Sequence, residues 1–158
     1  MKILWAPWRV TFITEKKDVC IFCDNPKRND DSLIFERRTH VFAMLNKYPY
    51  NSGHTMIAPY RHVINIEDLT NEEWMELFQL MKDCLKAIRK IMSPDGFNIG
   101  FNIGKSSGAG YEHIHLHIVP RWIGDTNFMP VLSDTKVIPE HLEATYRKLV
   151  NELKNLKS

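Results

Sequence analysis

The chain has 158 residues, of which 44% are hydrophobic and 25% charged, and this size and composition suit one domain with a real hydrophobic core. Its net charge of +2, from 21 basic and 19 acidic residues, gives no bulk attraction to nucleic acid, so an anionic ligand would need a local site. No segment approaches the ~18 consecutive apolar residues of a membrane span, and three cysteines without an export signal favour the reducing cytoplasm.

Neither an internal repeat nor a linker divides the chain, and we expect a single domain over residues 1–158. Within it, an N-terminal arm covers 1–19, a core covers 20–122, and a C-terminal extension with a helix covers 123–158. Apolar stretches bounded by turn-rich segments predict strands at residues 35–45, 55–59, 97–103 and 112–119.

Two helices are predicted. The first follows Thr70, which forms a capping box with Glu73, and its helical spacing of apolar residues ends at Ser93, before a proline. The second begins at Pro139 and runs to about Leu156. Because strands and helices do not alternate regularly, the expected fold class is α+β, a mostly antiparallel sheet with a long helix after the middle strands and a C-terminal helix.

The segment His-Ile-His-Leu-His at residues 113–117 is the most informative stretch of the sequence. Side chains on a strand alternate between two faces, so His113, His115 and His117 are expected on one face and the apolar residues between them on the other. Next-but-one residues lie ~6.6 Å apart, which makes a row of imidazoles ~13 Å long. A solvated strand face is the simpler alternative, but three histidines on one face favour a functional cluster.

Cys20 and Cys23 form a C-x2-C knuckle that can present two thiolates to one metal ion. Alone the pair is weak evidence, because two cysteines can also be small buried hydrophobes. His62 and His113 are available to complete a Cys2His2 set, and four protein ligands leave no position for water, which predicts a structural zinc site. Cys84 lies among the apolar positions of the first helix and is expected to pack in the core.

Residues 104–110, Gly-Lys-Ser-Ser-Gly-Ala-Gly, form a loop that leads directly into the histidine strand. Its backbone N–H groups, including that of Gly108, and the side chains of Ser106 and Ser107 can converge on an anion. The spacing matches neither a Walker A loop nor a dinucleotide fingerprint, and by itself the loop is no more than a connection between strands. Its position beside neutral imidazoles favours attack on phosphorus, with fixed donors around the phosphoryl oxygens.

These motifs resemble the histidine triad (HIT) superfamily. Residues 113–118, His-Ile-His-Leu-His-Ile, resemble its signature, and the upstream segments 51–59, Asn-Ser-Gly-His-Thr-Met-Ile-Ala-Pro, and 61–63, Arg-His-Val, are also typical. Residues 4–9, Leu-Trp-Ala-Pro-Trp-Arg, and 120–130, Pro-Arg-Trp-Ile-Gly-Asp-Thr-Asn-Phe-Met-Pro, are similar to the prokaryotic branch that resembles diadenosine tetraphosphate phosphorylases.

The resemblance implies a role for each matching residue. His115 would be the nucleophile that attacks the α-phosphorus and forms a nucleotidyl-histidine intermediate, while His117 and His54 would contact phosphate or support the nucleophile. Asn46 falls at the ribose-binding position and Asn102 at a position near the phosphates. The metal ligands of zinc-bearing members match Cys20, Cys23, His62 and His113.

One position departs from the family pattern. Gly110 stands where many hydrolases have a serine or threonine that bonds the leaving group, and that role would pass to Ser106 or Ser107. The nucleophile must be neutral, which suits a histidine of ordinary pKa ~6.5, and its second ring nitrogen needs an acceptor, for which a backbone carbonyl is expected. For Phe22 and Tyr48, packing is favoured over contact with a base.

The resemblance implies an enzyme that cleaves dinucleoside polyphosphates such as diadenosine tetraphosphate, with phosphate favoured over water as the acceptor. Hydrolysis of the same substrates or of nucleoside phosphoramidates is one alternative, and a non-catalytic nucleotide-binding module is another. An adenine dinucleoside polyphosphate is the expected partner, without nucleic acid or membrane, and a homodimer is the expected assembly.

Overall fold

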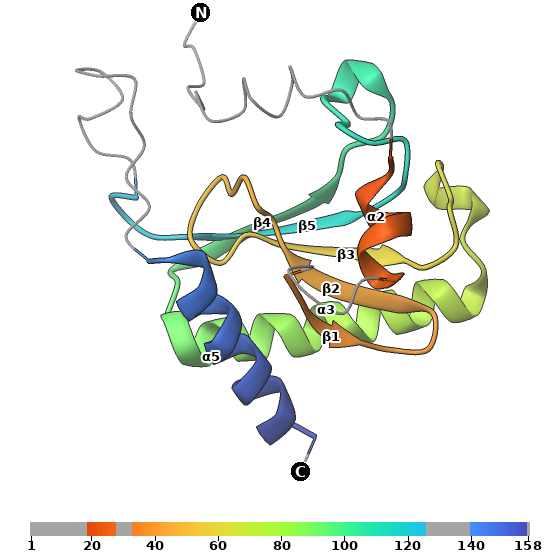
Figure 1. Ribbon diagram of the computed structural model, residues 1–158. Helices are drawn as coiled ribbons and strands as arrows, with labels where there is room; N and C mark the ends of the chain where they lie inside the picture. Colours follow the sequence, from red (N-terminus) through yellow and green to blue (C-terminus); the bar gives the residue numbers. More distant parts are fainter. Residues whose placement is uncertain (1–18, 28–32, 126–139, 158) are drawn as a thin grey trace, which may run out of the picture.

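The computed structural model describes residues 19–27, 33–125 and 140–157, so most of the predicted arm, together with Pro139, lies outside the described residues. Its centre is a five-stranded sheet in the order β1-β2-β3-β5-β4, and every neighbouring pair of strands is antiparallel (Figure 1). The strands are β1 Ile34–Arg37, β2 Val41–Leu45, β3 Thr55–Pro59, β4 Gly96–Phe101 and β5 Leu116–Arg121. The helices are α2 Ile21–Asp24, α3 Asn71–Met92 and α5 Leu142–Asn155, with 3-10 turns η1 Asn25–Lys27, η2 Ile66–Asp68 and η3 Lys105–Ser107. The predicted α+β class is confirmed.

Helix α3 begins as its sequence predicts. The Thr70 hydroxyl accepts a hydrogen bond from the Glu73 N–H at 3.2 Å, and the Glu73 carboxylate accepts one from the Thr70 N–H at 2.9 Å. These two bonds satisfy backbone donors that have no partner inside a helix. The helix ends at Ser93, whose φ of 47° takes the chain out of the helical path.

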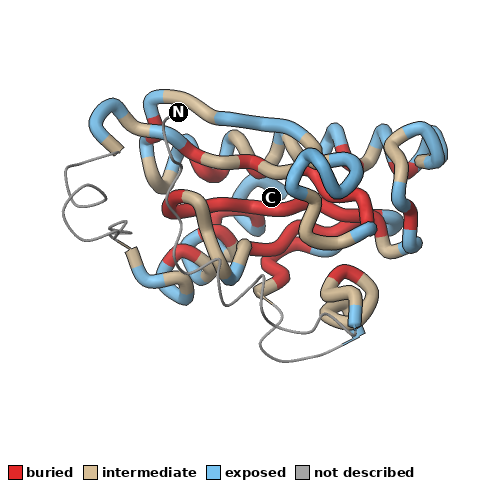
Figure 2. Tube along the Cα trace, turned by 90° about the horizontal axis from the view of Figure 1, so that it is seen from above, coloured by how far each residue is buried: buried red, intermediate tan, exposed pale blue. Residues whose placement is uncertain are grey.

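The sheet carries a different apolar layer on each face. On one face, α3 and α5 pack against residues that include Ile57, Leu116 and Ile118. On the other face, Phe22 of the short helix α2 packs in a cluster that includes Phe42. Figure 2 shows buried chain running through the middle of the molecule. The second face is the one that carries the histidines.

The prediction of one strand over residues 35–45 is wrong, because the structure has a hairpin of two strands, β1 and β2, in this region. The Arg38 N–H bonds the Val41 carbonyl across the turn, and the Glu76 carboxylate of α3 accepts hydrogen bonds from the N–H groups of residues 39–41. The backbone N–H groups of the turn therefore find their acceptor on a side chain more than 30 residues later in the chain, which local sequence patterns do not reveal.

The last two predicted strands differ from the observed ones at their ends. The strand expected at 97–103 is β4, which ends at Phe101, and the strand expected at 112–119 is β5, whose regular pairing begins only at Leu116. Before that point the Ile114 N–H bonds the carbonyl of Val63 in the loop after β3. The C-terminal helix begins at Leu142, later than the start predicted from the sequence.

Candidate active site and metal centre

The histidine segment keeps its alternation although regular pairing starts late. Leu116 and Ile118 point into the apolar cluster beneath α3, while the rings of His113 and His115 lie against Phe22 on the opposite face. The ring centroids of His115 and His117 are 4.6 Å apart. The predicted shared face is confirmed, and the imidazoles lie closer together than the strand spacing alone implies.

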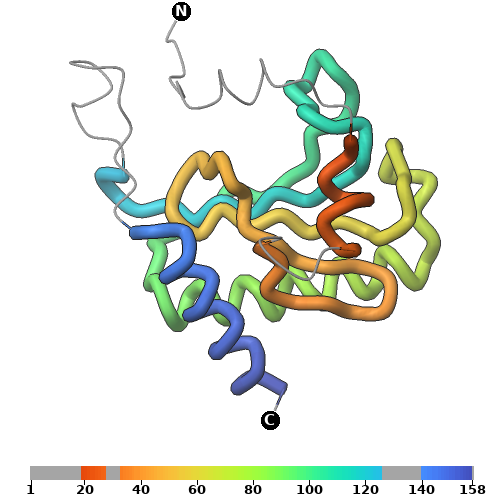
Figure 3. Tube along the Cα trace, viewed as in Figure 1, coloured from red at the N-terminus to blue at the C-terminus, as the bar shows by residue number. Residues whose placement is uncertain are grey.

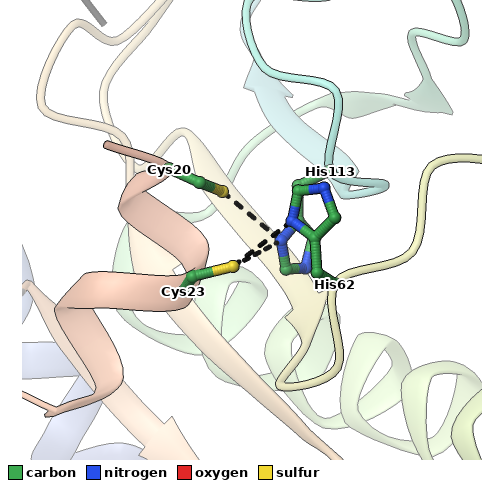
Figure 4. Close-up of side chains that lie close together, drawn as sticks. All are labelled: Cys20, Cys23, His62 and His113. Atoms are coloured by element: carbon green, nitrogen blue, oxygen red, sulfur yellow. Dashed lines mark hydrogen bonds between the residues drawn. The ribbon is translucent and has the colours of Figure 1, made fainter. Parts of the chain in front are cut away.

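The four predicted metal ligands meet in space from three separate segments (Figure 4). Their ligand atoms all lie within 4.8 Å of one another. The Sγ atom of Cys20 is 3.4 Å from Nδ1 of His113, and Sγ of Cys23 is 3.3 Å from Nδ1 of His62. Tetrahedral bonds of ~2.3 Å to sulfur and ~2.0 Å to nitrogen would separate such atoms by ~3.5 Å. The cluster is thus shaped to hold a metal ion.

The orientation of His113 also fits a metal ligand. Its Nε2–H donates to the Pro59 carbonyl at 3.0 Å, which leaves the lone pair on Nδ1 facing the two sulfur atoms. Metal-binding histidines commonly donate their second ring nitrogen in this way. Burial lowers the pKa of His113 to about 4, which keeps the ring in the neutral form that coordination requires.

The loop that carries His62 is fastened to α3 by its neighbour. Arg61 donates to both carboxylate oxygens of Glu73, at 3.0 and 2.7 Å, and to the carbonyl of Asp68. The bonds from Arg61 are the main cause that lowers the pKa of Glu73, and the bond from the Thr70 N–H lowers it further. Burial of the carboxylate acts in the opposite direction and raises this pKa. The capping residue of α3 therefore also anchors the metal-site loop.

His115 is held in one tautomer by the backbone. Its Nδ1–H donates to the carbonyl of His113 at 2.7 Å, so the lone pair lies on Nε2. The residue is only 5% exposed, and burial lowers the pKa of its imidazole while the bond to the carbonyl raises it. The structure thus bears out the expected carbonyl acceptor and favours a neutral His115 imidazole whose lone pair lies on Nε2.

Phe22 lies flat against that imidazole. The ring centroids of Phe22 and His115 are 4.5 Å apart with an interplanar angle of 29°. Phe22 is completely buried, so packing rather than an exposed base platform is its role, as favoured from the sequence. Sequence reasoning missed the contact with His115, and the only signal was the position of Phe22 between two cysteines.

His54 and His117 form a relay that sets a second tautomer. The Tyr50 N–H donates to Nδ1 of His54 at 3.1 Å, so neutral His54 carries its proton on Nε2. That Nε2 lies 2.9 Å from Nδ1 of His117 and donates to it. Neutral His117 therefore carries its own proton on Nε2 and does not need to be charged to act as a hydrogen-bond donor.

The turn before His54 depends on a glycine and on a distant carboxylate. Gly53 has a φ of +75°, and a Cβ atom there would lie 2.8 Å from Sδ of Met92. Asn51 Nδ2 donates to the Pro120 carbonyl at 3.0 Å and to Asp125 at 2.8 Å, which ties the turn to the end of β5. Nothing local in the sequence pairs Asn51 with a residue 74 positions later.

The structure places two of the predicted substrate-binding residues among local hydrogen bonds. The side-chain oxygen of Asn46 accepts the Tyr48 N–H at 2.9 Å, and its amide nitrogen lies 3.4 Å from Nδ1 of His54. The Ser107 hydroxyl lies 2.7 Å from the carbonyl of Gly104, within its own loop. Ser107 is exposed, and its hydroxyl also helps to form the loop.

The other predicted residues lie on or beside the same loop. Asn102 is half-buried just after β4, Ser106 is exposed within η3, and Gly108 ends η3 with a φ of +83°. Figure 3 shows the chain after this loop passing α2. The ring of Tyr111, the residue that follows the loop, meets Phe22 edge-on, with the two ring centroids 5.9 Å apart. The loop is therefore connected to the histidine site through Phe22.

An antiparallel sheet with three alternating histidines just before and within β5 agrees with the histidine-triad arrangement, and comparisons with known proteins establish the relation. A model of the HIT domain matches residues 27–122. The AP-4-A phosphorylase of Mycobacterium tuberculosis is 40% identical over 161 residues, covering 94% of this chain and 83% of that protein. The bis(5'-adenosyl)-triphosphatase of Dictyostelium discoideum is 34% identical over 90 residues, covering 57% of this chain and 60% of that protein.

A solved structure agrees with these sequence matches. The crystal structure of a Zn-bound histidine triad family protein from Mycobacterium smegmatis has a TM-score of 0.72 and 25% identity, covering 90% of this chain and 98% of that one. The chain belongs to the HIT domain family. The predicted family is confirmed, as is the prediction of a nucleotide-processing enzyme of the HIT type.

In the part of the chain that the structure describes, no helix has both the length and the apolar character needed to cross a membrane.

Proposed function

We propose that the chain cleaves dinucleoside polyphosphates such as diadenosine tetraphosphate by transferring a nucleotidyl group to His115 and then to phosphate. The observation that carries this proposal is the hydrogen bond from Nδ1–H of His115 to the His113 carbonyl at 2.7 Å. It leaves a lone pair on Nε2 of a ring whose pKa is lowered by burial. A neutral imidazole with one fixed, unprotonated nitrogen is the form that attacks phosphorus.

In the first step, Nε2 of His115 forms a bond to the α-phosphorus while the bond from that phosphorus to the bridging oxygen breaks. The electron pair leaves with the oxygen, and diadenosine tetraphosphate would release ATP. The imidazole then carries a positive charge, and its Nδ1–H still bonds the carbonyl of His113. That carbonyl stabilises the charge in the intermediate more than in the neutral ring.

His117 is suited to meet the phosphoryl oxygens. The relay from Tyr50 through His54 puts a proton on Nε2 of His117 while both rings are neutral. A donor whose proton is already in place needs no reorganisation when charge develops on the phosphoryl group. Asn102, Ser106 and the backbone of Gly108 remain proposed contacts to the substrate, and Asn46 to the ribose.

In the second step, an acceptor oxygen attacks the same phosphorus and the bond to Nε2 breaks, which restores the neutral imidazole. Phosphate as the acceptor gives ADP, so that the products are ADP and ATP. The 40% identity with a relative named AP-4-A phosphorylase, over 94% of the chain, supports this acceptor. Hydrolysis, which would give AMP and ATP, is the second candidate, and the similarity to a bis(5'-adenosyl)-triphosphatase supports it.

We also propose that the metal centre holds zinc with a structural role. Two thiolates and two imidazoles are a typical zinc set, and four protein ligands leave no position for water or substrate. The Zn-bound relative from Mycobacterium smegmatis supports this identity. The metal would link the loop before β5, the loop after β3 and the helix α2.

The predicted homodimer and cytoplasmic location stay predictions. Trp74, Phe78 and Ile99 are 40%, 50% and 44% exposed, on α3 and on the edge strand β4. Among the residues that the structure describes, β4 pairs only with β5, and apolar side chains beside such an edge are consistent with a second copy of the chain covering them.

The proposal is tested by product analysis. Diadenosine tetraphosphate is incubated with the protein with and without orthophosphate, and the expected products are ADP and ATP, formed only with phosphate. Formation of AMP and ATP without phosphate would show that the reaction is hydrolysis and not phosphorolysis. No turnover of any nucleotide would refute both reactions. His115→Ala should abolish turnover and the covalent adduct while leaving nucleotide binding within about threefold, because it removes the attacking imidazole and leaves the other proposed substrate contacts in place.

A further inference from the structure

The metal centre and the nucleophile share one aromatic contact. The Phe22 ring stacks on the ring of His115, with the two centroids 4.5 Å apart. Its centroid is 5.3 Å from that of His113 and 5.9 Å from that of Tyr111, which it meets edge-on. A single ring therefore contacts the proposed nucleophile, a metal ligand and the loop that precedes both. It is completely buried, so water does not reach the stacked face of the imidazole.

The position of Phe22 is set by its two cysteine neighbours. It lies in a single helical turn in which the N–H groups of Cys23 and Asp24 both bond the carbonyl of Cys20, each at 3.0 Å. A helix as short as α2 is not stable by its own hydrogen bonds. Its attachments to the rest of the molecule include the buried Phe22, the partly buried Ile21 and the two sulfur atoms that face His62 and His113.

We propose that Phe22 is a positioning residue through which the metal centre orients the imidazole of His115. This inference rests on the proposed role of His115 as nucleophile. A metal held by Cys20 and Cys23 would fix α2 against the sheet and so keep the phenyl ring against one face of the imidazole. The hydrogen bond to the carbonyl of His113 fixes the ring edge, and the phenyl ring fixes the ring plane.

Both constraints are needed to aim Nε2. A hydrogen bond along the Nδ1–H direction still allows the imidazole to rock about that axis. A flat, buried ring on one side blocks that motion and keeps the lone pair in line with an approaching phosphorus. Supporting residues of this kind commonly change rates by about 10- to 100-fold when they are removed.

The test uses Phe22→Leu, with Phe42→Leu as the matched control. Phe42 is also completely buried, belongs to the same apolar cluster, and packs on Tyr60 at 5.1 Å rather than on the histidines. Both variants are measured at saturating zinc for metal content, thermal midpoint, KM, and the single-turnover rate of formation of the histidine adduct. The ring protons of His115, assigned by their loss in His115→Ala, are followed by NMR.

We expect Phe22→Leu to keep one bound metal and a KM within about threefold, and to form the adduct about 10- to 100-fold more slowly. Its His115 ring protons should lose the upfield shift that a stacked phenyl ring produces. Removing the metal from the wild-type protein should move the same signals in the same direction. Phe42→Leu should lower the thermal midpoint comparably and change neither the rate nor these signals.

Adduct formation at the wild-type rate in Phe22→Leu would overturn the inference. So would an equal loss of rate in Phe42→Leu, unchanged His115 signals after metal removal, or loss of all metal binding in Phe22→Leu. Failure of the proposed function is recognised separately, because the wild-type protein would then form no histidine adduct, while the NMR signals still report whether the metal centre orients the ring.

Discussion

Replacing His54 by leucine tests whether it acts only through His117. The change removes the donor that lies 2.9 Å from Nδ1 of His117, so the His117 proton is no longer held on Nε2. The His117 ring can then turn its proton away from the phosphoryl group, and the magnitude below is that of losing this one hydrogen bond. A hydrogen bond to a charged group contributes ~1.5–3 kcal/mol, and ~1.36 kcal/mol corresponds to a tenfold change in rate. We expect His54→Leu to slow adduct formation about 10- to 150-fold.

The assay is a double-mutant cycle on single-turnover rates. If His54 acts through His117, the variant with both His54→Leu and His117→Ala should react no more slowly than His117→Ala alone. Purely additive losses would refute the relay, because they would mean that each ring acts separately. A His54→Leu variant with the wild-type rate would also refute it.

Two further predictions concern stability. Removing the metal with a chelator should lower the thermal midpoint by roughly 8–16 °C, because a ligand at 1,000 times its Kd stabilises the folded protein by ~4 kcal/mol. Added zinc should restore the midpoint. An unchanged midpoint in scanning calorimetry would contradict the metal centre. Glu73→Gln should lower the free energy of unfolding by ~1–2 kcal/mol at pH 7. This value is at the low end of what a hydrogen bond between charged groups contributes, because the Arg61 side chain that donates to the Glu73 carboxylate is 50% exposed. Since the pKa of Glu73 is lowered on folding, its contribution is present above its ordinary pKa of ~4.3 and is lost as the pH falls through the folded value. Urea denaturation curves of the two proteins should therefore differ at neutral pH and converge in acid, and a difference that persists in acid would contradict this account.

Patterns with a strong local cause were predictable from the sequence. The capping box of Thr70 and Glu73 set the start of α3, and the alternation of residues 113–118 placed three histidines on one face. The Cys20–Cys23 pair predicted a metal site, and His62 and His113 were chosen from the seven histidines to complete it; the structure brings these four side chains together. Each of these depends on residues that are neighbours in sequence, or on chemistry that few residue types can supply.

What required the tertiary structure was the choice of partners across distance. The hairpin at residues 38–41 depends on Glu76 of α3, and the turn before His54 depends on Asp125. The tautomers of the histidines are set by backbone groups, the carbonyls of residues 59 and 113 and the N–H of residue 50, which every residue has and which no sequence pattern distinguishes. The sequence by itself determined which side chains are available for the proposed chemistry. Only the packing of distant segments decided which nitrogen of each ring carries its proton, because a tautomer is selected by the nearest donor or acceptor in space.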